Sequence, residues 1–393
     1  MEERFFPYAR QSISEEDIAA VAQALRGERI TRGEKTREFE ERLASYTGAR
    51  FAVVFNNGTA ALYAAFFAAR AAPQDRFLTT PNSFIATTGA GMRLGLRPLF
   101  VDIERESGNM DIEKLAQALE TPLSRGRLLI APVHFRGLAI DMRALEHKLR
   151  TPDAVIIEDA CHALGSFYPS GEKVGSCPYC QMTVFSFHPA KTITTGEGGA
   201  VTTNDKALYE RLLRFRNNGI VRRKPLLEGN EAPSYYEVHD ITGNFHMTEL
   251  SAVLGLSQLS HIDRFIEKRR SLVARYRSHL GTHPLLLLSP PRYDAITAFH
   301  LMVVQINFSK LSITRSALIE ELQAAGIGTD VHYVPIFCHP VVRAVLGDVS
   351  EAYPECMRYY EETLSLPLYY DLTDADVDHI SKTLVGVINR TLK

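Results

Sequence analysis

One lysine stands in a loop between two apolar segments, a setting that favours imine chemistry. Lys191 comes after residues 182–187, which alternate and are apolar enough for a buried strand. Three glycines between residues 196 and 199 follow it and allow a sharp bend or a close approach of the backbone. Partial burial would lower the pKa of the lysine and make its amine nucleophilic. The alternative is a surface lysine on a flexible loop, and the flanking segments count against it without deciding alone.

A second candidate site lies at residues 51–70, where an apolar strand, a turn of small residues and a helix follow one another. The free N–H groups of the first helical turn carry the positive end of the helix dipole and can bind an anion. Gly58 allows close approach, and Thr59 adds a hydroxyl donor. An ordinary helix N-cap has the same features, so this turn alone is weak evidence for a phosphate site.

Two further residues come within a few positions after apolar segments. Asp159 follows the run Val155-Ile156-Ile157. A buried carboxylate there needs a cationic or donor partner, which a protonated pyridine nitrogen would supply; otherwise it caps the next turn. Phe84 could stack on an aromatic ring, although core packing is the more frequent role of phenylalanine.

Strands and helices alternate along the first 217 residues, which predicts a mainly parallel sheet with helices on both faces. Ligands of such sheets bind at the C-terminal ends of the strands. Thr59, Phe84, Asp159 and the loop 186–191 all follow such ends. The expected strands cover residues 51–55, 77–80, 98–101, 128–131, 154–157, 182–187 and 200–203.

The remainder of the chain predicts a smaller α+β domain. An irregular stretch at 218–244 is longer than most loops, which favours a functional or interface role. A long helical region at 247–280 follows it. Beyond it we expect strands at 299–308 and 328–334 and helices at 314–325, 340–346, 353–364 and 374–391. We therefore expect a large domain at 1–255, which includes a helical arm at 1–30, and a small domain at 256–393.

Composition indicates an ordinary soluble enzyme-sized chain. It has 393 residues, of which 45% are hydrophobic and 23% charged, and a net charge of −2, which argues against a nucleic-acid-binding surface. The N-terminus lacks the layout of a signal peptide. The most apolar stretch, 59–72, is interrupted by Arg70 and is too short to span a bilayer. We therefore expect a cytoplasmic protein that binds neither nucleic acid nor membrane.

The five cysteines are an odd and sparse set, which fits a reducing compartment. Cys177 and Cys180 have CxxC spacing, but a structural zinc site would need a second pair of ligands. Cys161 and His162 are the nearest candidates in the sequence. We therefore interpret the CxxC pair as loop thiols and expect no metal site.

Together these segments resemble the DegT/DnrJ/EryC1/StrS family of sugar aminotransferases, which use pyridoxal 5′-phosphate (PLP) on the aspartate-aminotransferase (type I) fold. The similarity extends from residues 30–33 to residues 331–335, and the stretch 186–199 is its most specific part. The motifs that carry it occur in family order: Asn57-Gly58-Thr59, Glu158-Asp159-Ala160, Ser186-Phe187-His188-Pro189-Ala190-Lys191, Gly196-Glu197-Gly198-Gly199 and Gly243-Asn244-Phe245. The resemblance implies a three-layer sandwich with a mainly parallel sheet and a smaller C-terminal domain.

The resemblance also implies roles in binding the cofactor. Lys191 would form the imine with PLP and later carry protons, and Asp159 would keep the pyridine nitrogen protonated. Phe84 would stack on the ring, and His162 would lie near a cofactor oxygen. The phosphate would be bound by Gly58, Thr59 and Ser186, and by Asn244 of a second subunit, so the resemblance implies a homodimer with shared active sites.

For the substrate, the resemblance implies contacts from Thr31, His188, His332 and Tyr333. The segments 132–135, 160–165 and 186–199 are most similar to family members of the pseudaminic acid pathway, the UDP-4-amino-4,6-dideoxy-N-acetyl-β-L-altrosamine transaminases. These enzymes aminate C4 of a UDP-4-keto-6-deoxy-N-acetylhexosamine.

The sequence departs from the family pattern at two places. Gly243 and His246 replace the usual tyrosine and arginine, and a histidine is shorter and mostly neutral at pH 7. Gly137-Leu138 replaces the usual Gly-Gln pair. A contact with phosphate or with the sugar nucleotide is therefore weakened or lost, and the substrate is less certain than the cofactor.

We therefore expect transfer of an amino group from glutamate to C4 of a nucleotide-linked 4-keto-6-deoxy sugar. One alternative is an aminase of a GDP or dTDP sugar, acting at C3 or C4. The related sugar dehydratases carry histidine in place of Lys191, which argues against them. The alternative from another class is a regulatory protein that has kept the fold and lost turnover.

Overall fold

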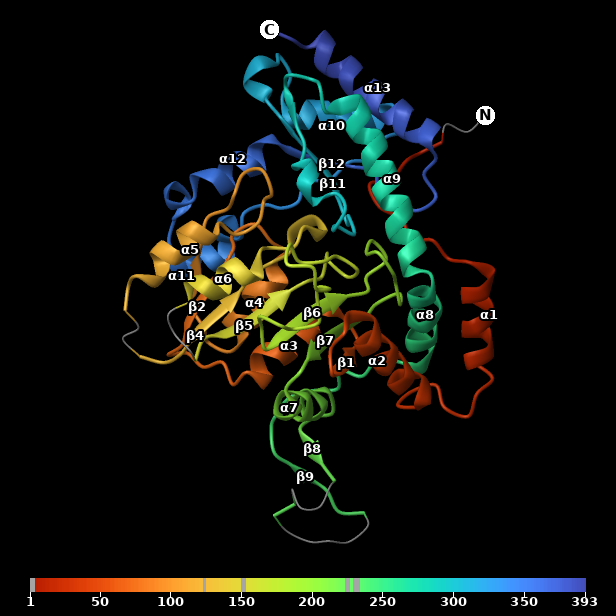
Figure 1. Cartoon of the computed structure of the whole chain (residues 1–393), viewed down its shortest axis with the longest axis vertical. Coiled ribbons are helices and arrows are strands. Elements are labelled where there is room, and N and C mark those ends of the chain that lie inside the picture. The colour runs from red at the N-terminus through yellow and green to blue at the C-terminus, as the bar shows by residue number, and fades with distance from the viewer. Residues whose placement is uncertain (1–3, 123–124, 150–152, 223–226, 229–233) are drawn as a thin grey trace.

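A seven-stranded sheet forms the centre of the molecule, shown in a computed structural model that describes residues 4–122, 125–149, 153–222, 227–228 and 234–393 (Figure 1). Its strand order is β1-β7-β6-β5-β4-β2-β3. The strands are β1 (Phe51–Phe55), β2 (Arg76–Thr79), β3 (Pro98–Phe100), β4 (Leu128–Ala131), β5 (Val155–Asp159), β6 (Met182–Ser186) and β7 (Gly199–Thr203). Strand β7 runs in the opposite direction to the other six strands of this sheet. The predicted mainly parallel sheet is confirmed.

Helices cover both faces of this sheet, because its strands carry apolar side chains on both sides. On β1, Val53 and Phe55 face one hydrophobic core, whereas Ala52 and Val54 face another. The first core is closed by α3 (Gly58–Ala68), α4 (Ile85–Arg93) and α7 (Lys206–Arg216). The second is closed by α2 (Glu34–Thr47), α5 (Ile112–Leu119), α6 (Met142–Lys148) and α8 (Glu249–Ser260). The three-layer sandwich is therefore confirmed.

The C-terminal part is built on a small antiparallel sheet of β10 (Leu286–Leu287), β11 (Met302–Ile306) and β12 (Thr363–Leu366). Its helices are α9 (Ile262–Leu280), α10 (Arg315–Ala324), α11 (Pro340–Leu346), α12 (Pro354–Glu362) and α13 (Asp374–Arg390). Short 3-10 turns are η1 (Phe135–Gly137), η2 (Pro291–Tyr293), η3 (Phe308–Lys310), η4 (Ile336–Cys338) and η5 (Ser350–Ala352). Figure 1 shows α9, α10 and α13 gathered around β11 and β12, at the end of the molecule where both termini lie.

The strand predicted at 328–334 is wrong. Asp330 makes a single bridge with Ser365, through backbone hydrogen bonds of 3.2 and 2.7 Å, and the chain then leaves the sheet. The third strand is instead Thr363–Leu366, whose first two residues fall in the helix predicted at 353–364. By leaving the sheet after Asp330, the chain carries His332 and Tyr333 to the cavity described below.

The predicted long helical region is divided at His261 into α8 and α9. Helix α8 packs on α1 (Glu15–Ala24) and α2, whereas α9 packs on α13. The predicted boundary between residues 255 and 256 stays a prediction, and the helices change packing partners at His261.

A short hairpin of β8 (Ile220–Val221) and β9 (Glu237–Val238) extends beyond α7 (Figure 1). It lies within the predicted irregular stretch 218–244, of which residues 223–226 and 229–233 fall outside the described residues. Among the helices that the structure describes, none is long and apolar enough to cross a bilayer.

Candidate active site

A cavity of about 880 Å³ opens at the C-terminal ends of β1, β5 and β6. Loops of the C-terminal part close it from the other side, through His300, Asp330, His332 and Tyr333. Ten of the twelve predicted site residues line it: Gly58, Thr59, Phe84, Asp159, His162, Ser186, His188, Lys191, His332 and Tyr333. The structure thus brings together residues that are up to 275 positions apart in the sequence, from Gly58 to Tyr333 (333 − 58).

Lys191 lies half-buried in the loop after β6. Burial lowers the pKa of its ammonium group, and the nearby Cys161 and Asp159 offset this only in part. Its Nζ lies 3.3 Å from Nε2 of His300. A larger fraction of this amine is therefore neutral, and able to attack a carbonyl or take up a proton, than of a lysine in water.

Asp159 ends β5 and is 5% exposed. Because side chains alternate along a strand, it lies on the face covered by α4, where the hydroxyl of Thr87 donates to its Oδ2. The backbone N–H of Cys161 donates to its Oδ1 at 3.0 Å. These two donors fix the orientation of a buried carboxylate that also lines the cavity, where it can pair with a positively charged nitrogen.

An anion-binding corner lies where α3 begins next to Ser186. The side chain of Asn57 caps this helix by accepting from the N–H of Ala60 at 2.8 Å, and Thr59 is exposed on the first turn. A Cβ on Gly58 would lie 2.9 Å from Cβ and 3.0 Å from Oγ of Ser186. The helix start and the Ser186 hydroxyl are thus close enough to hold one phosphate between them.

Glycine is required in the segment that follows Lys191. Gly199 lies so close to the backbone of Asn57 that a Cβ would sit 2.6 Å from that carbonyl oxygen. Gly196 has a φ of +78°, a conformation that other residues rarely adopt. Gly199 thus lets β7 pack beside the start of α3, and Gly196 lets the chain bend, which are the two uses predicted for these glycines.

His162 is a neutral ring that links the two sides of the cavity. Its Nδ1 accepts from the backbone N–H of Arg136 at 3.3 Å, so its proton lies on Nε2, 3.1 Å from the hydroxyl oxygen of Tyr333. Burial, with the charge of Lys191 and then His332, lowers its pKa well below the usual value. His332 in turn bonds Ser365 Oγ through Nδ1 at 2.8 Å.

The ring of Phe84 is 57% exposed and therefore does not serve the hydrophobic core. It immediately precedes α4, and its centroid lies 6.1 Å from that of Tyr333. An exposed ring at the edge of a cavity is available to cover a flat ligand, so this setting favours stacking over core packing.

Two predicted residues lie outside the cavity lining of their own chain. Thr31 is exposed and pairs with Thr248 through its backbone, and Asn244 is exposed and pairs with Asn217.

His246, which departs from the family pattern, donates a hydrogen bond from Nε2 to Oδ1 of Asn217 at 3.2 Å. Burial lowers its pKa to about 4, helped by the positive charges of Arg216 and then Arg32. It is neutral at pH 7 and does not replace the charge of an arginine.

Sequence reasoning also missed residues of the cavity and its supports, among them Thr87, Tyr8, His300 and Asp330. Thr87, which holds Asp159, lies one helical turn after Phe84 in a helix that was predicted, so its spacing could have suggested it. Tyr8, His300 and Asp330 come from the arm and the C-terminal part, and no local pattern marks them. Only tertiary structure brings them to the cavity.

Cys177 and Cys180 share a neighbour, since their sulfur atoms lie 3.4 and 3.3 Å from the hydroxyl of Thr183. Among the residues that the structure describes, no group of three or more His, Cys, Asp or Glu side chains could hold a metal ion.

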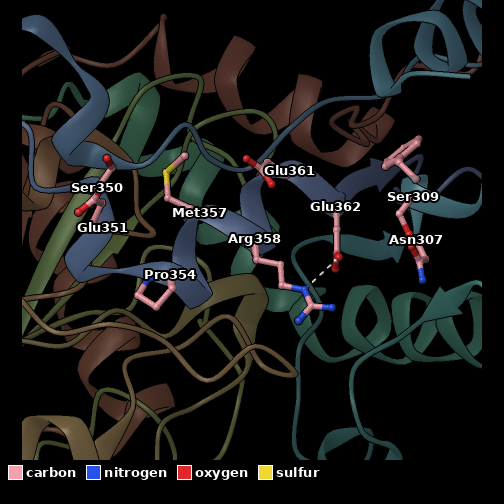
Figure 2. Close-up of a pocket in the computed structure, with 10 residues that line it drawn as sticks. Asn307, Ser309, Ser350, Glu351, Pro354, Met357, Arg358, Glu361 and Glu362 are labelled. Carbon is pink, nitrogen blue, oxygen red and sulfur yellow. Dashed lines mark hydrogen bonds and ion pairs between the residues drawn. The ribbon is translucent and has the colours of Figure 1, made fainter.

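A second, more open hollow lies on the C-terminal part (Figure 2). It holds about 680 Å³ beside α12, where Arg358 pairs with Glu362 at 3.2 Å and the hydroxyl of Ser309 donates to Asn307 Oδ1 at 2.6 Å. None of the predicted site residues lines it. The cavity at the ends of the strands therefore remains the candidate active site.

The three buried histidines of the cavity predict that stability falls in acid. The pKa of His332 is lowered to about 4, chiefly by burial, and those of His162 and His300 lie well below the usual value. Below pH 6.5 the unfolded chain binds protons that the folded chain does not, so the free energy of unfolding falls as the pH falls. His332 alone lowers the free energy of unfolding by about 3 kcal/mol between pH 7 and pH 4. Above pH 6.5 these histidines are neutral in the folded and the unfolded chain, so they do not make the free energy of unfolding depend on pH.

Urea unfolding of the cofactor-free protein between pH 7.5 and 4.5 measures this loss. The variant His332→Gln, which can still bond Ser365, should show a shallower slope below pH 6.5. A free energy of unfolding that stays constant between pH 7 and 5 would contradict the prediction.

The sequence model of the DegT/DnrJ/EryC1/StrS aminotransferase family matches residues 11–385. The spore coat polysaccharide biosynthesis protein SpsC of Bacillus subtilis is 33% identical over 385 residues, covering 98% of this chain and 97% of that protein. The UDP-4-amino-4,6-dideoxy-N-acetyl-β-L-altrosamine transaminase of Campylobacter jejuni is 31% identical over 387 residues, 98% of both chains.

Solved structures share the whole fold. Helicobacter pylori PseC, an aminotransferase of pseudaminic acid biosynthesis, has a TM-score of 0.87 at 27% identity, over 98% of this chain and 100% of that one. The PLP-form of the sugar aminotransferase Spr1654 of Streptococcus pneumoniae has a TM-score of 0.88 at 28% identity, over 99% of this chain and 100% of that one. A buried carboxylate, a half-buried amine and a helix start beside a serine hydroxyl could bind the ring nitrogen, the aldehyde and the phosphate of PLP, respectively.

Proposed function

Because the chain belongs to the DegT/DnrJ/EryC1/StrS family of PLP-dependent sugar aminotransferases, we propose that it moves an amino group from glutamate to C4 of a nucleotide-linked 4-keto-6-deoxy sugar. The observation that carries this proposal is the cavity in which Lys191 and Asp159 lie together with the start of α3. The alternative of a regulatory protein would call for the loss of one of these two residues, and both are present and buried or half-buried.

The residues of the cavity would hold the cofactor at three points. The N–H groups of the first turn of α3, with the hydroxyls of Thr59 and Ser186, would bind its phosphate. Asp159 would pair with the ring nitrogen, and Phe84 would cover the ring. His162 would lie near a cofactor oxygen. When bound, PLP supplies the carbonyl that accepts the amino group and a ring that withdraws electrons from the reacting carbon.

Lys191 would then act as the proton carrier of both half reactions. Its lowered pKa leaves a larger fraction of the amine unprotonated than in a lysine in water, so that it can take a proton from the reacting carbon and return it. The buried carboxylate of Asp159 would hold the positively charged ring nitrogen of the cofactor in place. The attraction between the two charges is stronger where water is excluded.

The sugar would enter the open side of the cavity. His188 is exposed there, whereas His332 and Tyr333 come from the C-terminal part, so the three can contact opposite sides of one substrate. Thr31 and Asn244 are exposed and outside this cavity, and we propose that they complete the site of a second subunit in a homodimer.

The proposed substrate is UDP-4-keto-6-deoxy-N-acetylhexosamine, as in pseudaminic acid biosynthesis. The names of the Campylobacter and Helicobacter relatives support it. SpsC is at least as similar and is named for spore coat polysaccharide, and His246 carries no charge at pH 7. Amination of a GDP or dTDP sugar, at C3 or C4, therefore remains the alternative.

A panel of keto sugars tests the substrate. The PLP-loaded protein would be incubated with glutamate and with UDP-, GDP- and dTDP-linked 4-keto-6-deoxy sugars or 3-keto sugars, and NMR of each product would locate the new amine. We expect the fastest turnover with the UDP-linked N-acetyl sugar and an amine at C4. Faster turnover of a GDP or dTDP sugar, or an amine at C3, would replace this substrate by the alternative.

A further inference from the structure

His300 provides the side-chain hydrogen-bond acceptor for the reactive lysine. It comes from the segment just before β11, 109 positions from Lys191, and its Nε2 lies 3.3 Å from Nζ. It is 3% exposed. Among the residues that the structure describes, no other side chain forms a hydrogen bond with Nζ.

The backbone of His300 is held by two hydrogen bonds, and its ring packs against one neighbouring ring. Its backbone N–H donates to the carbonyl of Arg136 at 2.9 Å, and its own carbonyl accepts from Nη1 of Arg269 at 3.3 Å. The ring packs against that of His162, with centroids 4.2 Å apart. A ring held in this way offers its nitrogen at a fixed position.

The surroundings keep this ring neutral. The charged or titratable groups that face it are Lys191, His162, Arg269 and His332, all of them cations when protonated. Burial and these groups lower its pKa well below the usual value. A neutral ring that accepts at Nε2 carries its proton on Nδ1, and within the described residues Nδ1 has no hydrogen-bond partner although it is buried.

A buried polar atom without a partner destabilises a fold, so the ring is better explained by what Nε2 does than by packing. We propose that His300 is a positioning residue, which holds Nζ of Lys191 at one place in the cavity whenever the amine is not bound to the cofactor. This inference rests on the proposed role of Lys191. A fixed amine meets its target in one geometry, whereas a released one samples many.

The test measures how fast the cofactor-free protein takes up PLP at different pH values, from the growth of visible absorbance and from borohydride trapping on Lys191. Gln places an amide oxygen or nitrogen where Nε2 stands, whereas the shorter Asn does not reach Nζ and Leu has no acceptor. In His300→Asn and His300→Leu we expect the plateau rate at high pH to fall about 10- to 100-fold. The midpoint of the pH profile should move to lower pH, because a bond to the charged ammonium is lost.

His300→Gln should stay close to wild type, and so should His279→Leu, which replaces a histidine of α9 outside the cavity. The inference is overturned if Gln, Asn and Leu at position 300 behave alike, whether all are normal or all are equally slow. If Leu does not fold, the Gln and Asn pair decides. Failure of wild type to take up PLP, or uptake by Lys191→Ala on another lysine, would instead count against the proposed function.

Discussion

Replacing Lys191 with alanine should abolish covalent attachment of PLP and slow amino transfer by about 1,000-fold or more. The amine is both the group that binds the cofactor and the proposed proton carrier, and general acid–base catalysis alone is worth about 10²- to 10⁴-fold. Burial in the cavity lowers the pKa of Lys191, and the substitution leaves the rest of the cavity in place. The measurement is turnover of glutamate with the keto sugar, together with the mass of the peptide that carries residue 191 after borohydride reduction.

Lys191→Arg is the matched control, because it keeps a positive charge but supplies neither a nucleophile nor a proton carrier near neutral pH. It should be as inactive as the alanine variant. Trapping of the cofactor on a different lysine, or activity of Lys191→Ala within 10-fold of wild type, would show that this residue does not carry the chemistry.

Asp159→Asn should lower turnover by about 10²- to 10³-fold, because breaking a buried ion pair costs roughly 3–5 kcal/mol. The N–H of Cys161 can still donate to the amide oxygen, and the hydroxyl of Thr87 can turn to accept from the new NH2 group, so the side chain should keep its place. Without cofactor, the buried carboxylate has no cationic partner at hydrogen-bond distance among the described residues. The cofactor-free variant should therefore be at least as resistant to urea as wild type.

Thr87→Val is a milder variant with which Asp159→Asn can be compared. It removes one donor but keeps the charge, so we expect a loss of about 10-fold, in line with one hydrogen bond to a charged group. An Asp159→Asn enzyme that retains more than a tenth of the activity would contradict the proposed pairing with the cofactor. A large drop in stability together with lost activity would indicate a structural role instead.

The sequence predicted the large sheet well, because its signals are local. Strand β5 is a run of apolar residues that ends at Asp159. In a parallel sheet, ligands bind at the carboxyl ends of the strands, so polar residues that follow such an end are candidates for a site. Lys191 and Thr59 were found in the same way, each directly after a strand. These three positions needed only periodicity and the positions of glycines.

The rest of the site depends on contacts between distant segments. The segment 328–334 is apolar enough for a strand, yet it bridges only through Asp330 and then turns to place His332 and Tyr333 in the cavity. His300 lies within the strand predicted at 299–308 but precedes the observed β11 and carries no motif, and its role depends on where the C-terminal part meets the loop after β6. Such juxtapositions are set by packing, which no local pattern records.

The most direct test of the central claim is the visible absorption spectrum of the PLP-loaded protein, recorded before and after addition of glutamate and then of the UDP-linked 4-keto-6-deoxy-N-acetylhexosamine. We predict that glutamate removes the visible band as the amino group passes to the cofactor, and that the keto sugar restores it. A band that glutamate leaves unchanged, in a protein with a full complement of PLP, would contradict the assignment of this cavity as the site of amino transfer from glutamate.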